Sequence, residues 1–218
     1  MMLVVDCTDR VARASGLQAA TAAVRRGDLV LLPVEHSYAI ATDAFSIRGA
    51  QRVRQVKGQG PSMPLAILVP GASTVMGLAA AVPQSARDLM TAFWPGPVTL
   101  LLTPQPTLAW DQPDGHPIAL RMPLHPVALE LLQRTGPLIA TSANALGLEP
   151  PATVAEAIEQ LGEAFAACLD AGRLDSLGEV STVVDATGPV PVVLRPGAIP
   201  IEVIREVCPQ AAEPDPIG

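Results

Sequence analysis

The strongest constraint on the fold is the regular alternation, along the chain, of apolar runs of strand length with segments of helical pattern. The runs are short, rich in Val, Ile and Leu, and bounded by Gly, Pro or polar residues, as expected of strands buried in a sheet. Strands that alternate with helices predict one α/β domain built on a mixed sheet. The predicted strands are 29–34, 38–41, 65–69, 98–103, 118–122, 138–141, 182–185 and 192–195.

The segments between these strands carry helical patterns with start and stop signals. Ser15 is placed to cap the first helix and Gly27 to end it, while Thr153 and Glu156 have the spacing of a capping box. Ile199 marks the start of the last helix. The predicted helices are 16–26, 47–56, 73–81, 85–93, 126–134, 154–161 and 200–207.

Length and composition narrow the class of protein. The chain has 218 residues, of which 49% are hydrophobic and 16% charged. This length can bury a full core without disulfides or metals, and the composition excludes a disordered chain. No apolar run approaches the ~20 residues of a membrane span, and the N-terminus lacks the basic lead-in of a signal peptide. We therefore predict a cytoplasmic domain over residues 1–207 and a short, loosely held C-terminal tail over 208–218.

Charge and cysteine content restrict the partners and the compartment. The net charge of −7 argues against phosphate-mediated nucleic-acid binding as the main role, because such proteins carry a basic stripe. A local basic cleft remains compatible with this balance. The cysteines Cys7, Cys168 and Cys208 are far apart and form no C-x-x-C pair, which indicates a reducing compartment.

Several common functional motifs are absent from the sequence. It contains no Walker P-loop, no G-x-G-x-x-G dinucleotide fingerprint and no G-x-S-x-G elbow. His36, His116 and His125 lack the spacing of metal ligands, so no metal site is predicted. His125 precedes a proline near a helix start, which favours a capping or surface role.

Polar residues at strand ends and in turns are the remaining candidates. Lys57, the only lysine, ends a basic helix before a glycine-rich loop, where it can meet a phosphate or carboxylate or simply stabilise the helix terminus. Ser142 and Asn144, the only asparagine, follow a predicted strand and face the same way if the chain is extended. They suit a nucleotide or phosphate oxygen, and equally an Asx or Ser/Thr turn.

Three further polar residues lie at the ends of other predicted strands. Ser181 and Arg195 supply a hydroxyl and a second cation, and Arg121 stands at the end of its strand, ahead of Pro123. Tyr38 is the only tyrosine of the chain.

In chain order, these pieces resemble the motifs of the YrdC-type family, the threonylcarbamoyl-AMP synthases. The resemblance runs from about residue 27 to about residue 204. The family motif PTETVYGL corresponds to PVEHSYAI at 33–40, KGRP…PL to KGQG at 57–60 with MPL at 63–65, and fWPGPlT to FWPGPVT at 93–99. The motifs RxP, SAN, STVvD and LRPGai correspond to residues 121–123, 142–144, 181–185 and 194–199.

The resemblance implies a single-domain α/β fold with a twisted, open, mixed sheet flanked by helices and a concave, positively charged cavity. It implies a nucleotidyltransferase that converts threonine, bicarbonate and ATP, with Mg²⁺ held mainly by the nucleotide, into threonylcarbamoyl-AMP and pyrophosphate. The product would pass to a downstream complex that modifies tRNA, without stable tRNA binding by this chain and without a membrane.

The resemblance also implies roles for individual residues. The catalytic set would be Lys57, Ser142 and Asn144. The nucleotide would be bound by Lys57, Gln59, Ser142, Asn144, Ser181 and Arg195. The amino-acid substrate would be bound by Val34, His36, Tyr38, Met63, Arg121 and Ser181.

The sequence departs from the family pattern in two substrate-facing motifs. Gln59 stands where the family has an arginine, and a neutral amide loses a charge-assisted bond worth ~1.5–3 kcal/mol. Val34 and His36 replace the threonines of PTET, Ala39 replaces a glycine, and Met63 replaces a frequent histidine. Three interpretations stay open: a synthase that tolerates these changes, a paralogue that adenylates another carbamoyl substrate, and a non-catalytic protein that binds nucleotide or RNA.

Overall fold

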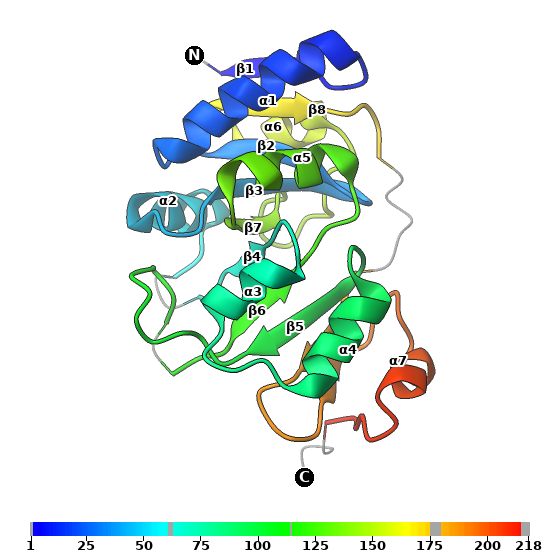
Figure 1. Ribbon diagram of the computed structural model, residues 1–218. Coiled ribbons are helices and arrows are strands. Elements are labelled where there is room, and N and C mark those ends of the chain that lie inside the picture. The colour runs from blue at the N-terminus through cyan, green and yellow to red at the C-terminus, as the bar shows by residue number, and fades with distance from the viewer. Residues whose placement is uncertain (1, 61–62, 114, 175–179, 215–218) are drawn as a thin grey trace.

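The computed structural model describes residues 2–60, 63–113, 115–174 and 180–214. These residues form one twisted, mixed sheet of ten strands in the order β1-β8-β2-β3-β7-β4-β6-β5-β9-β10, with helices against it (Figure 1). Within the described ranges, no helix is long and apolar enough to span a membrane. The strands are β1 (Leu3–Asp6), β2 (Val30–Val34), β3 (Ser37–Asp43), β4 (Ala66–Leu68), β5 (Val98–Leu102), β6 (Ile118–Arg121), β7 (Leu138–Ser142), β8 (Ala167–Asp170), β9 (Thr182–Asp185) and β10 (Val192–Arg195).

The predicted strands and helices are confirmed in type, with shifts at their ends. The helices are α1 (Arg10–Arg25), α2 (Ile47–Lys57), α3 (Ala72–Leu78), α4 (Gln84–Phe93), α5 (Pro126–Thr135), α6 (Val154–Leu161) and α7 (Ile201–Val207). The sequence analysis missed β1 and β8, which pair with each other in parallel. Strand β8 has the sequence Ala-Cys-Leu-Asp, whose small and acidic residues favour strands weakly, so its position is set by pairing with β1 and β2.

Helix α1 starts earlier than predicted, and the assignment of Ser15 as its cap is wrong. The carboxylate of Asp9 accepts a hydrogen bond from the Ala12 amide at 2.7 Å and caps the helix, whereas Ser15 lies inside it. A charged acceptor at a helix N-terminus satisfies a free amide and favours the helix dipole. Gly16 is needed in this helix, because a Cβ there would come within 2.7 Å of Val5 on β1.

Other helix ends agree more closely with the predicted signals. Thr153 caps α6 by accepting from the Glu156 amide at 3.1 Å, as the capping-box spacing predicts. His125 caps α5, where its Nδ1 accepts from the Val127 amide at 3.3 Å, so the capping role is confirmed. The last helix starts after Pro200 rather than at Ile199.

The sheet separates two apolar layers, because successive side chains of a strand point to opposite faces. On β2, Val30 and Leu32 pack in the layer that contains α1 and α5, and Leu31 packs in the layer that contains α2 and α6. Figure 1 shows α1 and α5 lying together over the same part of the sheet. Four of the polar residues identified in the sequence lie instead at the ends of elements: Lys57 ends α2, and Arg121, Ser142 and Arg195 end β6, β7 and β10.

The C-terminal segment is held more firmly than predicted. Cys208 and Ala211 are buried, and Ala212 exchanges backbone hydrogen bonds with Pro191 and Val193 at 2.9 and 2.8 Å. The expectation of a loosely held tail is therefore wrong for residues 208–212, because the edge strand β10 has unpaired backbone groups that this segment satisfies. Residues 215–218 lie outside the described residues, and the domain limit at 207 remains a prediction.

Strand pairing determines which polar residues come together. Antiparallel pairing of β3 with β7 sets Ser142 opposite Ala39, so the end of β7 lies beside the start of β3. Antiparallel pairing of β5 with β6, and parallel pairing of β5 with β9, set Arg121 at the same end of the sheet as Val98 and Thr182.

Candidate functional site

Lys57, Ser142 and Asn144 form one hydrogen-bonded cluster. Lys57 is the last residue of α2 and only 5% exposed, and Gly58 caps the helix in the left-handed conformation at φ 62°. The Lys57 Nζ donates to the Ser142 carbonyl oxygen at 2.8 Å, to the Asn144 Oδ1 at 2.9 Å and to the Asn144 carbonyl oxygen. The structure thus brings together the three residues for which the family resemblance implies a catalytic role.

The ammonium of Lys57 faces neutral oxygens. Burial lowers the pKa of Lys57, which reflects the cost of holding its charge away from water. Among the described residues, no carboxylate lies within ion-pair distance of it. Its acceptors belong to β7 and the following loop rather than to the last carbonyls of α2, so its contacts are not those of a lysine that stabilises its own helix. A buried, unpaired cation is an attractive partner for a phosphate or carboxylate.

Asn144 uses both ends of its amide to shape the loop after β7. Its Oδ1 accepts from Lys57 and from the Ser142 hydroxyl at 2.5 Å, and its Nδ2 donates to the Leu148 carbonyl at 2.6 Å. Gln160 of α6 accepts from the Ala145 amide at 2.9 Å. The side chains of Ser142 and Asn144 are thus engaged with Lys57 and with the loop after β7, and their role toward a nucleotide stays a prediction.

Gln59 stands two residues after Lys57 with an unsatisfied side chain. Its backbone amide donates to the Arg54 carbonyl at 2.8 Å. Its Oε1 is buried and has no hydrogen-bond partner in the described part of the chain. A buried acceptor without a donor costs ~1–3 kcal/mol, so this oxygen needs an explanation.

The loop between β5 and β6 helps to hold the segment between α2 and β4 in place. Arg54 is 3% exposed and donates to Asp111 Oδ2 at 2.6 Å, to the Asp111 carbonyl at 2.8 Å and to the Met63 carbonyl at 3.0 Å. Gln112 pairs with the amide and carbonyl of Leu65 at 3.3 and 3.0 Å. The Met63 side chain is 46% exposed. Sequence reasoning missed these anchors, although Arg54 lies one turn before Lys57.

Arg121 forms a second cluster with the turn between β2 and β3. Its Nη2 pairs with Glu35 Oε2 at 2.6 Å, and its Nε donates to the Gly96 carbonyl at 3.1 Å. The other Glu35 oxygen accepts from the Leu124 amide at 2.5 Å. Glu35 was missed in the sequence, although it lies inside a motif already singled out there.

Arg195 and Ser181 form a third cluster at the start of β9. Arg195 Nη2 donates to the Ser181 carbonyl at 2.7 Å and to its hydroxyl at 3.0 Å, and that hydroxyl shares a hydrogen bond with Thr99 at 2.9 Å. The pKa of Arg195 is lowered by burial and, secondly, by the positive charge of Arg121. The positive charge of Arg121 therefore acts on the Arg195 guanidinium.

The predicted substrate residues of the β2–β3 hairpin differ in accessibility. Val34 and His36 are half-buried. Tyr38 is completely buried, and its hydroxyl donates to Asp170 and to the Gly172 carbonyl at 3.1 and 2.7 Å. Burial raises the pKa of Tyr38. The side chain of Tyr38 thus supports the loop after β8 in this structure.

The hairpin relates the three clusters to one another. Its β3 strand pairs with the end of β7 at Ser142, and its turn contacts Arg121 through Glu35. The positive charge of Arg121 in turn lowers the pKa of Arg195. Within the described ranges, no hydrogen bond or ion pair joins the Lys57 cluster directly to the Arg195 cluster.

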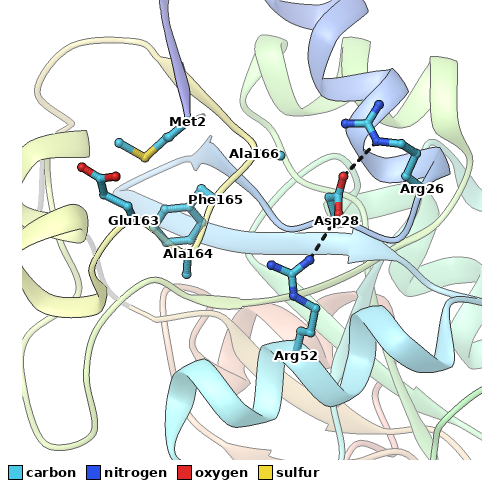
Figure 2. A pocket seen from close by; sticks show the side chains of 8 residues that line it. All are labelled: Met2, Arg26, Asp28, Arg52, Glu163, Ala164, Phe165 and Ala166. Atoms are coloured by element: carbon cyan, nitrogen blue, oxygen red, sulfur yellow. Dashed lines mark hydrogen bonds and ion pairs between the residues drawn. The ribbon is translucent and has the colours of Figure 1, made fainter.

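A separate surface hollow of about 330 Å³ lies between the sheet, α2 and the loop before β8 (Figure 2). There the Asp28 carboxylate bridges the guanidinium groups of Arg26 and Arg52 at 3.0 and 3.2 Å. None of the predicted site residues lines this hollow. A search of the described residues finds no group of three His, Cys, Asp or Glu side chains that could hold a metal ion.

Comparison with known proteins identifies relatives over almost the whole chain. The model of the Sua5, YciO and YrdC family, described as "Telomere recombination", matches residues 22–197. A Mycobacterium tuberculosis protein (strain H37Rv), provisionally named a threonylcarbamoyl-AMP synthase, is 43% identical over 203 residues, which are 93% of each chain. The threonylcarbamoyl-AMP synthase of Bacillus subtilis is 31% identical over 93% of this chain and 60% of its own length.

A solved structure supports the same kinship. The crystal structure of Pyrococcus abyssi Sua5 complexed with L-threonine superposes with a TM-score of 0.85 and 30% identity. The match covers 98% of this chain and 62% of the Sua5 chain. This chain therefore spans about three fifths of the Sua5 and Bacillus proteins, but nearly the full length of the mycobacterial one.

Proposed function

The chain belongs to the Sua5/YciO/YrdC family, and from that premise we propose that it is a threonylcarbamoyl-AMP synthase acting in tRNA modification. The observation that carries the proposal is the convergence of Lys57, Ser142 and Asn144 around one buried, unpaired ammonium. Relatives that are 43% and 31% identical to this chain over the aligned residues bear the name of this enzyme.

The reaction requires positioning and charge neutralisation more than covalent catalysis. The amine of threonine and bicarbonate combine to a carbamate with loss of water. A carbamate oxygen then forms a bond to the α-phosphorus of ATP, and the bond from that phosphorus to the bridging oxygen breaks, which releases pyrophosphate. Holding the reactants in line and stabilising the developing negative charge supply the rate enhancement.

The clusters suit different parts of this task. Lys57 would neutralise phosphate charge, with Ser142 and Asn144 fixing its direction. Arg195 and Ser181 would contact the nucleotide or the carbamoylated substrate, and Arg121 would receive the carboxylate of the amino acid. The positive charge of Arg121 lowers the pKa of Arg195, which supports a locally positive site despite the net charge of −7.

The cofactor and partners follow from the proposed reaction. Mg²⁺ would arrive with ATP, bound mainly by the phosphate oxygens, and would help to neutralise the leaving pyrophosphate. The product would be consumed in the cytoplasm by a complex that transfers the threonylcarbamoyl group to tRNA. Stable tRNA binding by this chain is not part of the proposal.

One observation favours a second candidate, a paralogue that adenylates a carbamoyl group on another amine. The buried Oε1 of Gln59 has no donor among the described residues, and a donor group on a different substrate would satisfy it. Threonine itself carries an ammonium and a hydroxyl that could do the same, so the substrate has to be identified by experiment.

The test is pyrophosphate release from ATP by the purified chain, with threonine and bicarbonate added separately and together. Release that requires both establishes the synthase. Release that requires bicarbonate but responds to another amine establishes the paralogue. If ATP binds but no pyrophosphate appears with any amine tested, the catalytic proposals are wrong and a binding protein remains.

A further inference from the structure

Glu35 makes an arrangement that none of the proposed roles uses. The side chain is 10% exposed at the β2–β3 turn, and each of its two oxygens has its own partner. Oε2 forms an ion pair with Arg121 Nη2 at 2.6 Å, and Oε1 accepts a hydrogen bond from the Leu124 amide at 2.5 Å. Glu35 thereby joins the hairpin to both ends of the segment from Arg121 to Leu124.

Arg121 is consequently held from two sides. Its Nε donates to the Gly96 carbonyl at 3.1 Å, and its Nη2 forms an ion pair with Glu35. A planar guanidinium held at two of its nitrogens has little freedom to rotate. In the described part of the chain Nη1 makes no hydrogen bond, so this nitrogen remains to receive a ligand.

We propose that Glu35 is a positioning residue, which orients the Arg121 guanidinium so that its remaining N–H groups receive the carboxylate of the amino-acid substrate. The inference rests on the proposed function, because it takes Arg121 as the carboxylate's partner. Glu35 itself touches no substrate in this arrangement and acts through Arg121. Charge-assisted bonds of this kind are sensitive to direction, so a rotated Arg121 binds the carboxylate poorly.

The decisive variant is Glu35→Gln, because an amide has one acceptor where two are needed. Its NH₂ group must face either Arg121 or the Leu124 amide, donor against donor. The expected result is a rise in the KM for threonine of about ten- to a hundredfold, with the KM for ATP and kcat changed less than about twofold. Glu35→Asp keeps two acceptor oxygens and should recover part of the threonine KM.

A second variant tests whether Glu35 acts through Arg121. Arg121→Gln should raise the threonine KM by itself, and adding Glu35→Gln should raise it no further, since residues that act as a unit are not additive. Glu130→Gln is the matched control, because Glu130 pairs with Arg13 between α1 and α5 and makes no hydrogen bond or ion pair with Glu35 or Arg121 in the described part of the chain. The threonine KM of this variant should equal that of the wild type.

Two outcomes would overturn the proposal. A lower threonine KM in Glu35→Gln would mean that Glu35 competes with the substrate carboxylate for Arg121. An unchanged threonine KM with a lower Tm would mean that Glu35 only ties the hairpin to the following loop.

A separate measurement keeps this inference testable if the proposed function fails. If the wild type shows no threonine-dependent pyrophosphate release, the arginine Nε–H signals are recorded by NMR, with Arg121 assigned through Arg121→Lys. The Arg121 Nε–H donates to the Gly96 carbonyl, and Glu35 holds the guanidinium in the orientation that makes this bond. The Nε–H should therefore exchange slowly in the wild type and about tenfold or more faster in Glu35→Gln, because the released guanidinium turns away from Gly96. Equal exchange rates would show that Glu35 does not fix Arg121.

Discussion

Replacing Lys57 with methionine removes the ammonium while keeping a chain of similar length. The wild-type Nζ donates to three oxygens of Ser142 and Asn144. In Lys57→Met the two carbonyl oxygens lose this donor, while Asn144 Oδ1 keeps the Ser142 hydroxyl. Unsatisfied buried acceptors cost ~1–3 kcal/mol of unfolding free energy. The variant also avoids the desolvation that lowers the pKa of Lys57, so the net loss should fall in the lower half of that range.

The effect on ATP should be larger than the effect on stability. Losing one charge-assisted bond to phosphate weakens binding by about ten- to a hundredfold. At an ATP concentration of about 100 times the wild-type Kd, ATP stabilises the wild type by about 2.7 kcal/mol and the variant by only about 0.4–1.4 kcal/mol. A domain of this size gains about 2–4 °C in Tm per kcal/mol, so the ATP-induced shift should fall from about 5–11 °C to about 1–6 °C.

Thermal unfolding with and without ATP measures both quantities in one experiment. Arg52→Met is the matched control, because Arg52 lies on the same helix and pairs with Asp28 at the separate hollow. Its ATP-induced shift should equal that of the wild type. An undiminished shift in Lys57→Met would refute the assignment of Lys57 to the nucleotide, whatever happens to the Tm without ATP.

Two further predictions concern stability. Arg54→Leu should lower the free energy of unfolding in urea by about 2–3 kcal/mol, because it removes the buried guanidinium that pairs with Asp111. Arg173→Leu removes an exposed ion pair and should lower it by less than about 1 kcal/mol. Equal losses would contradict this prediction. Burial raises the pKa of the Cys168 thiol from 9.0 to about 12, so the folded state keeps a proton that the unfolded chain releases, and this contribution is complete below pH 9 and declines as the pH rises. Between pH 9.5 and 10.5, wild-type stability should therefore fall more steeply than that of Cys168→Ala, by about 1 kcal/mol per pH unit, and parallel slopes would disprove the assignment.

The fold was accessible from the sequence where apolar periodicity was strong. Strands such as β2 and β5 are almost entirely apolar runs, and they can be recognised as strands without information from distant residues. Strand β8 was missed because Ala167 and Cys168 have little intrinsic preference for a strand, and its parallel partners lie far away in the sequence. The cap of α1 was misplaced because Ser15 and Asp9 are both good caps, and only the position of β1 decides between them.

The candidate site was accessible where a rare residue type marked it. Lys57 and Asn144 are the only residues of their kind, and the structure joins them directly. Glu35 and Asp111 carry no such mark among many acidic residues. Their significance depends on which arginine each one meets, and that is fixed by strand pairing and by loop paths that no local pattern encodes.

The Lys57 ammonium donates mainly to the backbone, since two of its three acceptors are the carbonyl oxygens of residues 142 and 144. Every amino acid supplies such an oxygen, so substitution of Ser142 or Asn144 leaves these two acceptors in place. Replacing Ser142 or Asn144 therefore removes only the side-chain part of these contacts, whereas replacing Lys57 removes all of them. The backbone path of the loop after β7, which the Asn144 amide helps to hold, keeps the two carbonyl oxygens within reach of the ammonium.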